Sequence, residues 1–141
     1  MKTMPLLLVV ASVLLGSPIV AQEKKTPADA KPATAKPFKD IGPGEFDKLR
    51  KEKDAVVLDV RTKKEYEAGH ITGAVNIDWN SPDFEKKVTE LDKSKTYLVH
   101  CAGGVRSSKA CDKLSTLKFP KLFNLEGGLK AWEKAGKPVE K

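Results

Sequence analysis

The stretch that decides the fold is Thr96-Tyr-Leu-Val-His100, followed directly by Cys101-Ala-Gly-Gly-Val-Arg106. The first five residues predict a strand. Beyond the glycines, apolar residues recur near helical spacing from Val105 to Leu117, which predicts a helix over roughly 106–117. A cysteine is therefore expected where a strand ends, a tight loop turns and a helix begins.

Strand-like and helix-like segments alternate on both sides of this stretch. The continuous apolar run 55–60 predicts a strand that is covered on both faces, and shorter strands are expected at 74–77 and 122–125. Helices are expected after Pro43, over 63–68 behind a Thr62/Glu65 capping box, from a Ser81-Pro82 start, and after Gly127-Gly128. This alternation predicts an α/β fold, a mostly parallel central sheet with helices on both faces.

The loop after Cys101 has the features of an anion cradle. Successive backbone N–H groups in a tight loop point inward, and the first turn of the following helix adds unpaired donors and partial positive charge. Gly103 and Gly104 can adopt the positive φ that lets amides converge, and Arg106 adds a permanent charge. These features favour the thiolate, which is the reactive form of cysteine, so Cys101 is interpreted as a nucleophile.

The second cysteine, Cys111, lies within the predicted helix and is expected in the core. At about 1.5 Å rise per helical residue, its distance from Cys101 should exceed the Cα limit of about 7 Å for a disulfide. No disulfide is therefore predicted. Only His70 and His100 could join the cysteines as metal ligands, without a short Cys pair or His pair, so no metal or other cofactor is expected.

The N-terminal segment is not expected to belong to the fold. Lys2 precedes a nearly unbroken apolar run over 6–15, and small residues lead to Ala21, which predicts a secretory signal peptide over 1–21, with an uncleaved anchor as the alternative. Residues 22–37, rich in Lys, Ala and Pro, predict a disordered linker, so the domain should span 38–141. The expected location is secreted or periplasmic, without membrane attachment once the signal is cleaved.

The formal net charge of +7 is carried mainly by scattered lysines. Nucleic-acid binding would require clustered arginines with aromatic residues between them, and the sequence has no such cluster. No nucleic-acid partner is therefore expected, whereas a positive surface would raise the local concentration of small anions.

Three separated pieces of the sequence resemble the single-domain type of the rhodanese-like superfamily, and the resemblance covers residues 38–138. The pieces are Leu58-Asp-Val-Arg61 with Glu65-Tyr66, Gly69-His-Ile71 and Gly73-Ala-Val-Asn-Ile77; the loop 101–106; and Leu125-Glu-Gly-Gly128 with Ala131-Trp132. Each piece alone is weak, but their order and spacing together are specific.

This resemblance implies a sulfurtransferase. The Cys101 thiolate would take a sulfane sulfur from thiosulfate or from another persulfide or polysulfide, and the Cys101 persulfide would pass it to a thiol or cyanide acceptor. The loop residues Ala102, Gly103, Gly104 and Val105 would hold the terminal sulfur together with Arg106. Arg106 would also stabilise the loop and attract an anionic donor.

Other charged residues also fall on family positions. Asp59 and Arg61 end a strand at the same edge as Cys101, where either a supporting site role or a structural charge pair is open. His70 is interpreted as a loop anchor. His100 should point to the opposite face from Cys101, because adjacent strand residues alternate, and is not expected to act as its base.

Two other functions are alternatives. Ala102 stands where active family members often carry a cationic or polar side chain, which keeps open a non-catalytic or weakly catalytic binding module for an anion or a partner thiol. Related phosphatases have five residues between Cys and Arg, whereas this chain has four. The smaller ring of amides suits one sulfur atom better than a tetrahedral oxyanion.

Overall fold

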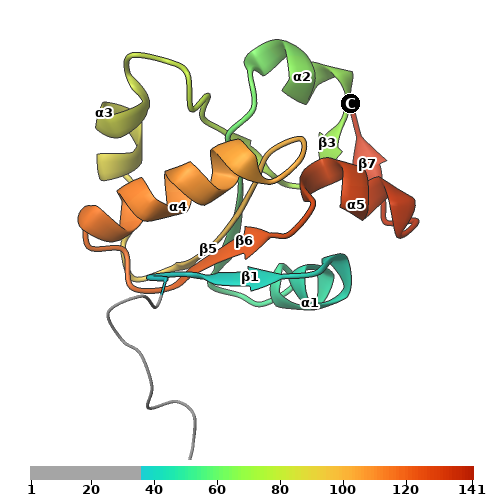
Figure 1. The fold of residues 1–141 in the computed structure, drawn as a ribbon, viewed down its shortest axis with the longest axis horizontal. Coiled ribbons are helices and arrows are strands. Elements are labelled where there is room, and N and C mark those ends of the chain that lie inside the picture. The colour runs from blue at the N-terminus through green and yellow to red at the C-terminus, as the bar shows by residue number, and fades with distance from the viewer. Residues whose placement is uncertain (1–35) are drawn as a thin grey trace, which may run out of the picture. The chain divides into compact units, whose positions relative to one another are not determined.

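The computed structural model describes residues 36–141 (Figure 1). The predicted signal peptide over 1–21 and residues 22–35 of the predicted linker lie outside the described residues. Lys36 and Pro37, which end that linker, are exposed, and the Lys36 ammonium lies 2.6 Å from the Asp40 carboxylate.

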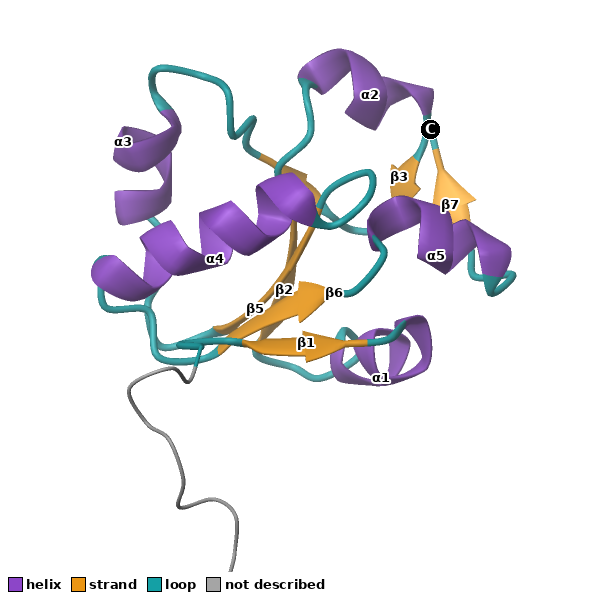
Figure 2. Cartoon of the chain, in the orientation of Figure 1, coloured by secondary structure: helices purple, strands orange, loops and turns teal. Residues whose placement is uncertain are grey.

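Strands and helices alternate along the described residues, as the sequence predicts, except that the strands at 70–71 and 75–76 follow each other directly (Figure 2). The strands are β1 (Lys39–Ile41), β2 (Ala55–Asp59), β3 (His70–Ile71), β4 (Val75–Asn76), β5 (Thr96–His100), β6 (Leu122–Leu125) and β7 (Val139–Glu140). The helices are α1 (Pro43–Leu49), α2 (Lys63–Ala68), α3 (Phe84–Thr89), α4 (Val105–Thr116) and α5 (Gly128–Lys134). The predicted α/β class is confirmed.

Five of the strands form one parallel sheet in the order β1-β6-β5-β2-β4. Strand β5 is central, and its Leu98 pairs with Val57 of β2 on one side and with Phe123 of β6 on the other. Strands β3 and β7 pair antiparallel in a separate two-stranded sheet. Since the five parallel strands end at one edge, Cys101, which follows β5, lies at the edge where sites form in such sheets.

Helices cover both faces of the sheet, which confirms the second part of the fold prediction. Alternate residues of β5 point to opposite faces. Tyr97 and Val99 pack in a core with the buried side chains of α3 and α4, whereas Leu98 packs in a second core with Phe46 of α1 and Trp132 of α5. Burial on both faces explains why these strands are continuous apolar runs.

The ends of two helices test the predicted start signals. The capping box is confirmed, because the Glu65 amide donates to Thr62 Oγ1 at 3.2 Å and the Thr62 amide donates to the Glu65 carboxylate at 3.1 Å. The Ser81-Pro82 helix start is wrong, because α3 begins at Phe84. Ser81 Oγ instead accepts from the Asp83 amide at 3.2 Å and closes a turn. A serine hydroxyl satisfies a backbone donor equally well in a turn and at a cap.

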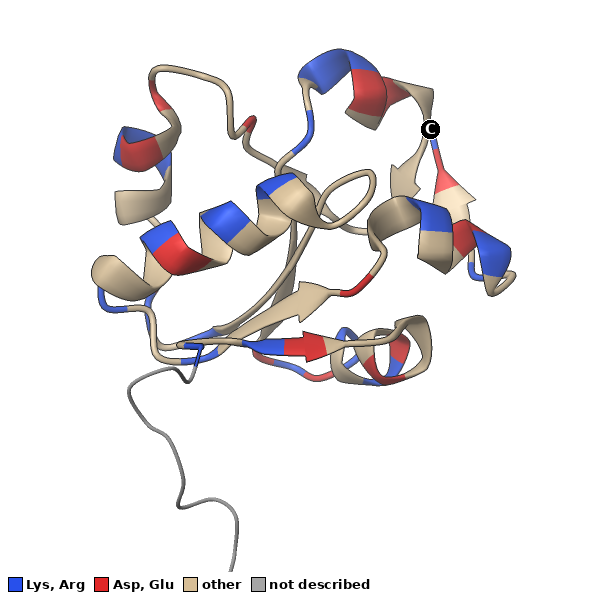
Figure 3. Ribbon diagram, in the orientation of Figure 1, with Lys and Arg blue, Asp and Glu red and all other residues tan. Residues whose placement is uncertain are grey.

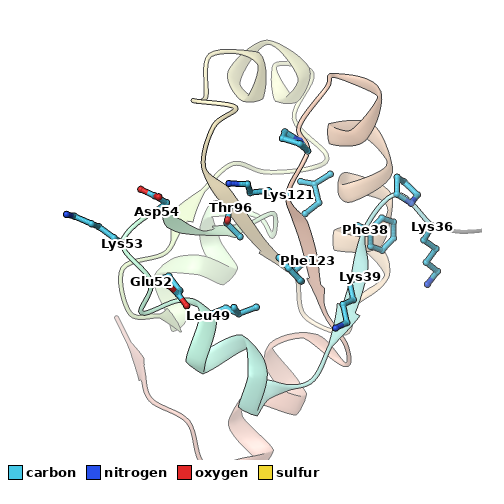
Figure 4. A pocket seen from close by; sticks show the side chains of 13 residues that line it. Lys36, Phe38, Lys39, Leu49, Glu52, Lys53, Asp54, Thr96, Lys121 and Phe123 are labelled. Carbon is cyan, nitrogen blue, oxygen red and sulfur yellow. The ribbon is translucent and has the colours of Figure 1, made fainter. Parts of the chain in front are cut away.

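A pocket of about 700 Å³ lies beside the beginning of β5 and β6 (Figure 4). Its lining includes Thr96 and Leu122, which are the first residues of β5 and β6, so it lies at the edge of the sheet opposite Cys101. Phe38 and Phe123 contribute apolar surface, and several lysines also line it. The full length of β5 separates this pocket from the cysteine loop.

Basic and acidic residues are interspersed along the helices (Figure 3). Within residues 36–141, no helix is long and apolar enough to cross a membrane. In the same range, no three His, Cys, Asp or Glu side chains come together as metal ligands would.

Candidate active site

Cys101 lies between the end of β5 and the start of α4, and it is only 1% exposed. Its Sγ belongs to the core on the α4 side of the sheet. The neighbouring His100 contacts Phe46 on the other side, with ring centroids 6.3 Å apart. Strand alternation thus separates His100 from the sulfur, as the sequence predicts.

The loop directs several donors at the Cys101 sulfur. The Gly104 amide donates to Sγ at 3.0 Å, and the Ser107 hydroxyl lies 3.4 Å from it. Burial raises the pKa of Cys101, but hydrogen bonds from the Ser107 hydroxyl and from the amides of Ser107, Gly104 and Gly103 outweigh it, so the pKa lies below its ordinary value. The arrangement therefore stabilises the thiolate.

The amides can face the sulfur because the loop's carbonyl groups are occupied elsewhere. The Leu129 amide donates to the Cys101 carbonyl at 2.8 Å, and the Lys130 amide donates to the Ala102 carbonyl at 3.1 Å. Both donors belong to the first turn of α5, whose amides have no partner inside the helix. The start of α5 therefore orients the cysteine loop (Figure 1).

Gly128 allows this close approach of α5 to the loop. Its φ is +62°, and a Cβ at this position would lie 2.5 Å from the Ala102 carbonyl oxygen and 2.6 Å from the Cys101 carbonyl oxygen. Backbone atoms cannot move aside as a flexible side chain can. The second glycine of the Gly127-Gly128 pair is therefore required by the loop, beyond the turn that the sequence predicts.

We predict that Gly128→Ala lowers the free energy of unfolding by more than about 3 kcal/mol, because it combines a backbone clash with a strained φ. The matched control is Gly136→Ala, where φ is +75° but nothing lies within 4 Å of the added Cβ. That variant should lose only the strain of about 1–2 kcal/mol. Urea unfolding of both variants measures the difference, and equal losses would contradict the role assigned to Gly128.

Arg106 forms a two-pronged ion pair with Glu65 across the site. Its Nη1 and Nη2 donate to the two carboxylate oxygens at 2.9 and 3.0 Å. Hydrogen bonding from Arg106 lowers the pKa of Glu65 from 4.5 to about 2. Because Glu65 also caps α2, one carboxylate joins the first turns of α2 and α4. The positive charge of Arg106 is thus balanced, which weakens the attraction of an anionic donor expected from the sequence.

We predict that the stabilising effect of Glu65 depends on pH. The carboxylate contributes fully above its unfolded pKa near 4.5, and the contribution is lost as pH falls toward the folded pKa of about 2. The difference in melting temperature between the wild type and Glu65→Gln should therefore shrink from pH 6 to pH 2. Glu67→Gln is the control, since Glu67 forms only an exposed pair with Lys63 at 3.8 Å, and its difference should stay small throughout.

The other predicted loop residues contribute backbone rather than side chains. Gly104 is the N-cap of α4 with φ +104°, a conformation that favours glycine. Gly103 is exposed, and the Val105 side chain is 68% exposed to solvent. Ala102 contributes the carbonyl that α5 binds. Of the predicted loop residues, Gly103 and Gly104 thus donate to the Cys101 sulfur through their amides, whereas Ala102 binds α5 and Val105 faces solvent.

Asp59 and Arg61 form a buried pair that does not reach the sulfur. Arg61 Nε donates to Asp59 Oδ1 at 2.9 Å, and its Nη2 donates to the Gly69 carbonyl at 2.8 Å. Asp59 lies opposite His100 in the sheet, 3.6 Å from its Nε2. These contacts are those of a structural charge pair. His70 likewise anchors its loop, with Nδ1 2.9 Å from the Tyr66 carbonyl.

Cys111 is fully buried in the core on the α4 side, as predicted. Burial raises its pKa well above the ordinary range. Both cysteines are free, which confirms the prediction that they form no disulfide. The pKa values of the two thiols therefore move in opposite directions, and Cys101 is the more readily ionised of the two.

Sequence reasoning missed two residues that the site uses. Ser107 supplies a hydroxyl at the sulfur, and its position six residues after Cys101, in the first turn of the predicted helix, is a signal that could have found it. The sequence places Glu65 in a capping box and in a family motif but indicates no role for it beside Cys101. Its pairing with Arg106, 41 positions away, has no local sequence signal.

Comparison with known proteins agrees with this geometry. The family model described as rhodanese-like domain matches residues 42–135. The thiosulfate sulfurtransferase GlpE of Pseudomonas putida is 36% identical over 104 residues, which are 73% of this chain and 91% of that protein. The crystal structure of a rhodanese-related protein from Thermoplasma volcanium superposes with a TM-score of 0.65 at 32% identity, covering 73% of this chain and 98% of that one.

A second kind of relative is longer. The tRNA uridine(34) hydroxylase of Cytophaga hutchinsonii is 38% identical over 99 residues, which are 68% of this chain. The match spans only 32% of the length of that hydroxylase. What the two proteins share is therefore one domain. With its parallel sheet, its cysteine loop and these matches, the chain belongs to the rhodanese-like domain family.

Proposed function

We propose that this protein is a sulfurtransferase that carries a sulfane sulfur on Cys101. The observation that supports this most directly is the convergence of the Gly104 amide and the Ser107 hydroxyl on Sγ. Donors placed there stabilise a thiolate before the reaction. We expect the amides of the loop to stabilise in the same way the outer sulfur of a persulfide, which carries its negative charge.

The proposed reaction has two half-reactions. The Cys101 thiolate attacks the outer sulfur of the donor, the donor's S–S bond breaks, and the donor leaves as sulfite or as a thiolate. A thiolate or cyanide then attacks the outer sulfur of the Cys101 persulfide, and the Cys101 thiolate is regenerated. Both steps are displacements at sulfur with no net oxidation, so they require no cofactor and predict ping-pong kinetics.

We infer that persulfides and polysulfides are better donors than thiosulfate. Thiosulfate carries two negative charges and would need unbalanced positive charge at the loop. Arg106 is paired with Glu65, and Ala102 offers no polar side chain. The arrangement therefore favours a donor of lower charge.

Loading of sulfur tests the proposal. The reduced chain from Gln22 onward, incubated with a polysulfide, should gain one sulfur atom, about 32 Da, in intact-mass spectrometry, because the Cys101 persulfide is covalent. Cyanide should remove the gain. Cys101→Ser, which keeps Cys111, is the control and should gain nothing. Thiosulfate should load the protein more slowly than the polysulfide.

Two outcomes would change the conclusion. If the folded and reduced protein forms no adduct with any sulfane donor, the sulfurtransferase proposal is wrong. The result would then favour a binding module for an anion or a partner thiol. An adduct that persists in Cys101→Ser would move the chemistry away from the proposed residue.

We further propose that the protein acts outside the cytoplasm. The support is the apolar segment 6–15 with small residues leading to Ala21. Expression of the full chain in a host with a secretion pathway should yield a mature protein that begins at Gln22 in the periplasm or the medium. A mass that retains Met1 and a membrane-bound fraction would instead support an uncleaved anchor.

A further inference from the structure

A line of hydrogen-bonded side chains connects the Cys101 sulfur to the surface. The Ser107 hydroxyl lies 3.4 Å from Sγ and 2.6 Å from Asn124 Oδ1. The Asn124 amide nitrogen donates to Asp40 Oδ1 at 2.8 Å, and the other Asp40 oxygen accepts from Lys36 Nζ at 2.6 Å. Ser107 is fully buried and Asn124 is 4% exposed, so the inner half of this line is shielded from water.

The single proton of the Ser107 hydroxyl has three acceptors within reach. They are Asn124 Oδ1 at 2.6 Å, the Gly104 carbonyl at 3.2 Å and Cys101 Sγ at 3.4 Å. A hydroxyl has one donor and two acceptor positions, so it can serve only one of them at a time. The hydroxyl therefore divides its proton among them, and the short contact with Asn124 leaves the sulfur only part of that donation.

Asp40 decides which end of the Asn124 amide faces Ser107. A carboxylate only accepts hydrogen bonds, so the NH₂ group of Asn124 must face Asp40. Its oxygen is therefore turned toward Ser107. Lys36 and Asn124 both hold the pKa of Asp40 below its ordinary value, so this residue stays ionised.

We propose that Asp40 and Asn124 are positioning residues that draw the Ser107 proton away from Cys101 for part of the time and thereby restrain the reactivity of its thiolate. This inference rests on the proposed role of Cys101 as the nucleophile. It identifies a surface carboxylate, through two buried side chains, as a determinant of the reactivity at the sulfur.

The other charged and titratable groups near Cys101 have separate roles. Arg106 of α4 is paired with Glu65 of α2, and Cys111 of α4 stays protonated in the core. His100 faces the opposite side of the sheet. Among the described residues, Ser107 is the side chain that joins the sulfur to Asn124 and so to Asp40.

Asp40→Asn should reverse the direction of the hydrogen bonds between position 40 and Asn124 and between Asn124 and Ser107. Lys36 only donates, so it takes the oxygen of the new amide and turns the NH₂ group toward Asn124. Asn124 must then present its oxygen to position 40 and its NH₂ group to Ser107. With its lone pair engaged by that NH₂ group, the Ser107 hydroxyl can donate only to the sulfur or to the Gly104 carbonyl, so its donation to the sulfur increases.

The test is the rate at which iodoacetamide alkylates Cys101 as a function of pH, followed by peptide mass spectrometry so that Cys111 is counted separately. Asp40→Asn should shift the midpoint of the pH profile downward. At a pH below the wild-type midpoint, alkylation should be about three- to tenfold faster, the size of one typical intramolecular hydrogen bond. Ser107→Ala should shift the midpoint upward, because it removes the part of the hydroxyl donation that reaches the sulfur in the wild type.

Two controls separate the hydrogen-bonded line from a simple loss of charge. Glu126→Gln removes a negative charge from the hollow beside Gly103 and Gly104 that Asp40 also lines, but Glu126 is exposed and outside the line. It should shift the profile far less than Asp40→Asn. In a Ser107→Ala background, Asp40→Asn should shift the profile no more than Glu126→Gln does.

The proposal fails if Asp40→Asn leaves the profile unchanged, shifts it no more than Glu126→Gln, or shifts it equally with and without the Ser107 hydroxyl. Position 40 is partly exposed and the substitution is nearly isosteric, and unchanged circular dichroism and melting temperature verify folding. Alkylation needs no sulfur donor. If the protein never loads sulfur but shows these shifts, the proposed sulfurtransferase function is wrong, whereas the proposed effect of Asp40 and Asn124 on the Cys101 thiol is supported.

Discussion

The site depends on the hydrogen bonds that the first turn of α5 makes to the cysteine loop. The amides of Leu129 and Lys130 take the carbonyl groups of Cys101 and Ala102, and this leaves the loop's own amides free to face the sulfur. The contact is possible because Gly128 has no side chain to separate the two backbones. The thiolate is thus stabilised because two backbone segments that are far apart in sequence form hydrogen bonds with each other.

The charged side chains at the site hold the loop and the neighbouring helices in place more than they attract an anionic substrate. The guanidinium of Arg106 is held by both oxygens of Glu65, which also caps α2, so three functions share one carboxylate: the cap, the ion pair and the placement of the first turn of α4. A guanidinium that is paired in this way holds the loop in place, but its positive charge attracts an incoming anion only weakly. The donors at the sulfur are neutral backbone amides and a hydroxyl, which suit a single negative charge on a small atom.

The two cysteines show how position in the fold sets reactivity. Both are almost fully buried, yet their pKa values move in opposite directions. Cys111 lies within a helix, where backbone amides are already engaged, so burial dominates. Cys101 lies in the loop that precedes the helix, where unpaired amides converge on it. The difference between a core thiol and a nucleophile is therefore a difference in backbone donors within a few ångströms.

The sequence alone determined the fold class, the parallel sheet, the capping box of α2, the separate environments of the two cysteines and the position of the cysteine loop. These features follow from local patterns, namely apolar runs, helical spacing and glycines at turns. The start of α3 was not determined, because Ser81 serves a turn as readily as a cap. Only the tertiary structure decided the pairing of Glu65 with Arg106, the contact of Gly128 with the loop, and the line from Ser107 to Asp40. Those contacts join residues up to 84 positions apart, and such distances leave no periodic signal, because the sheet and its crossover helices alone bring them together.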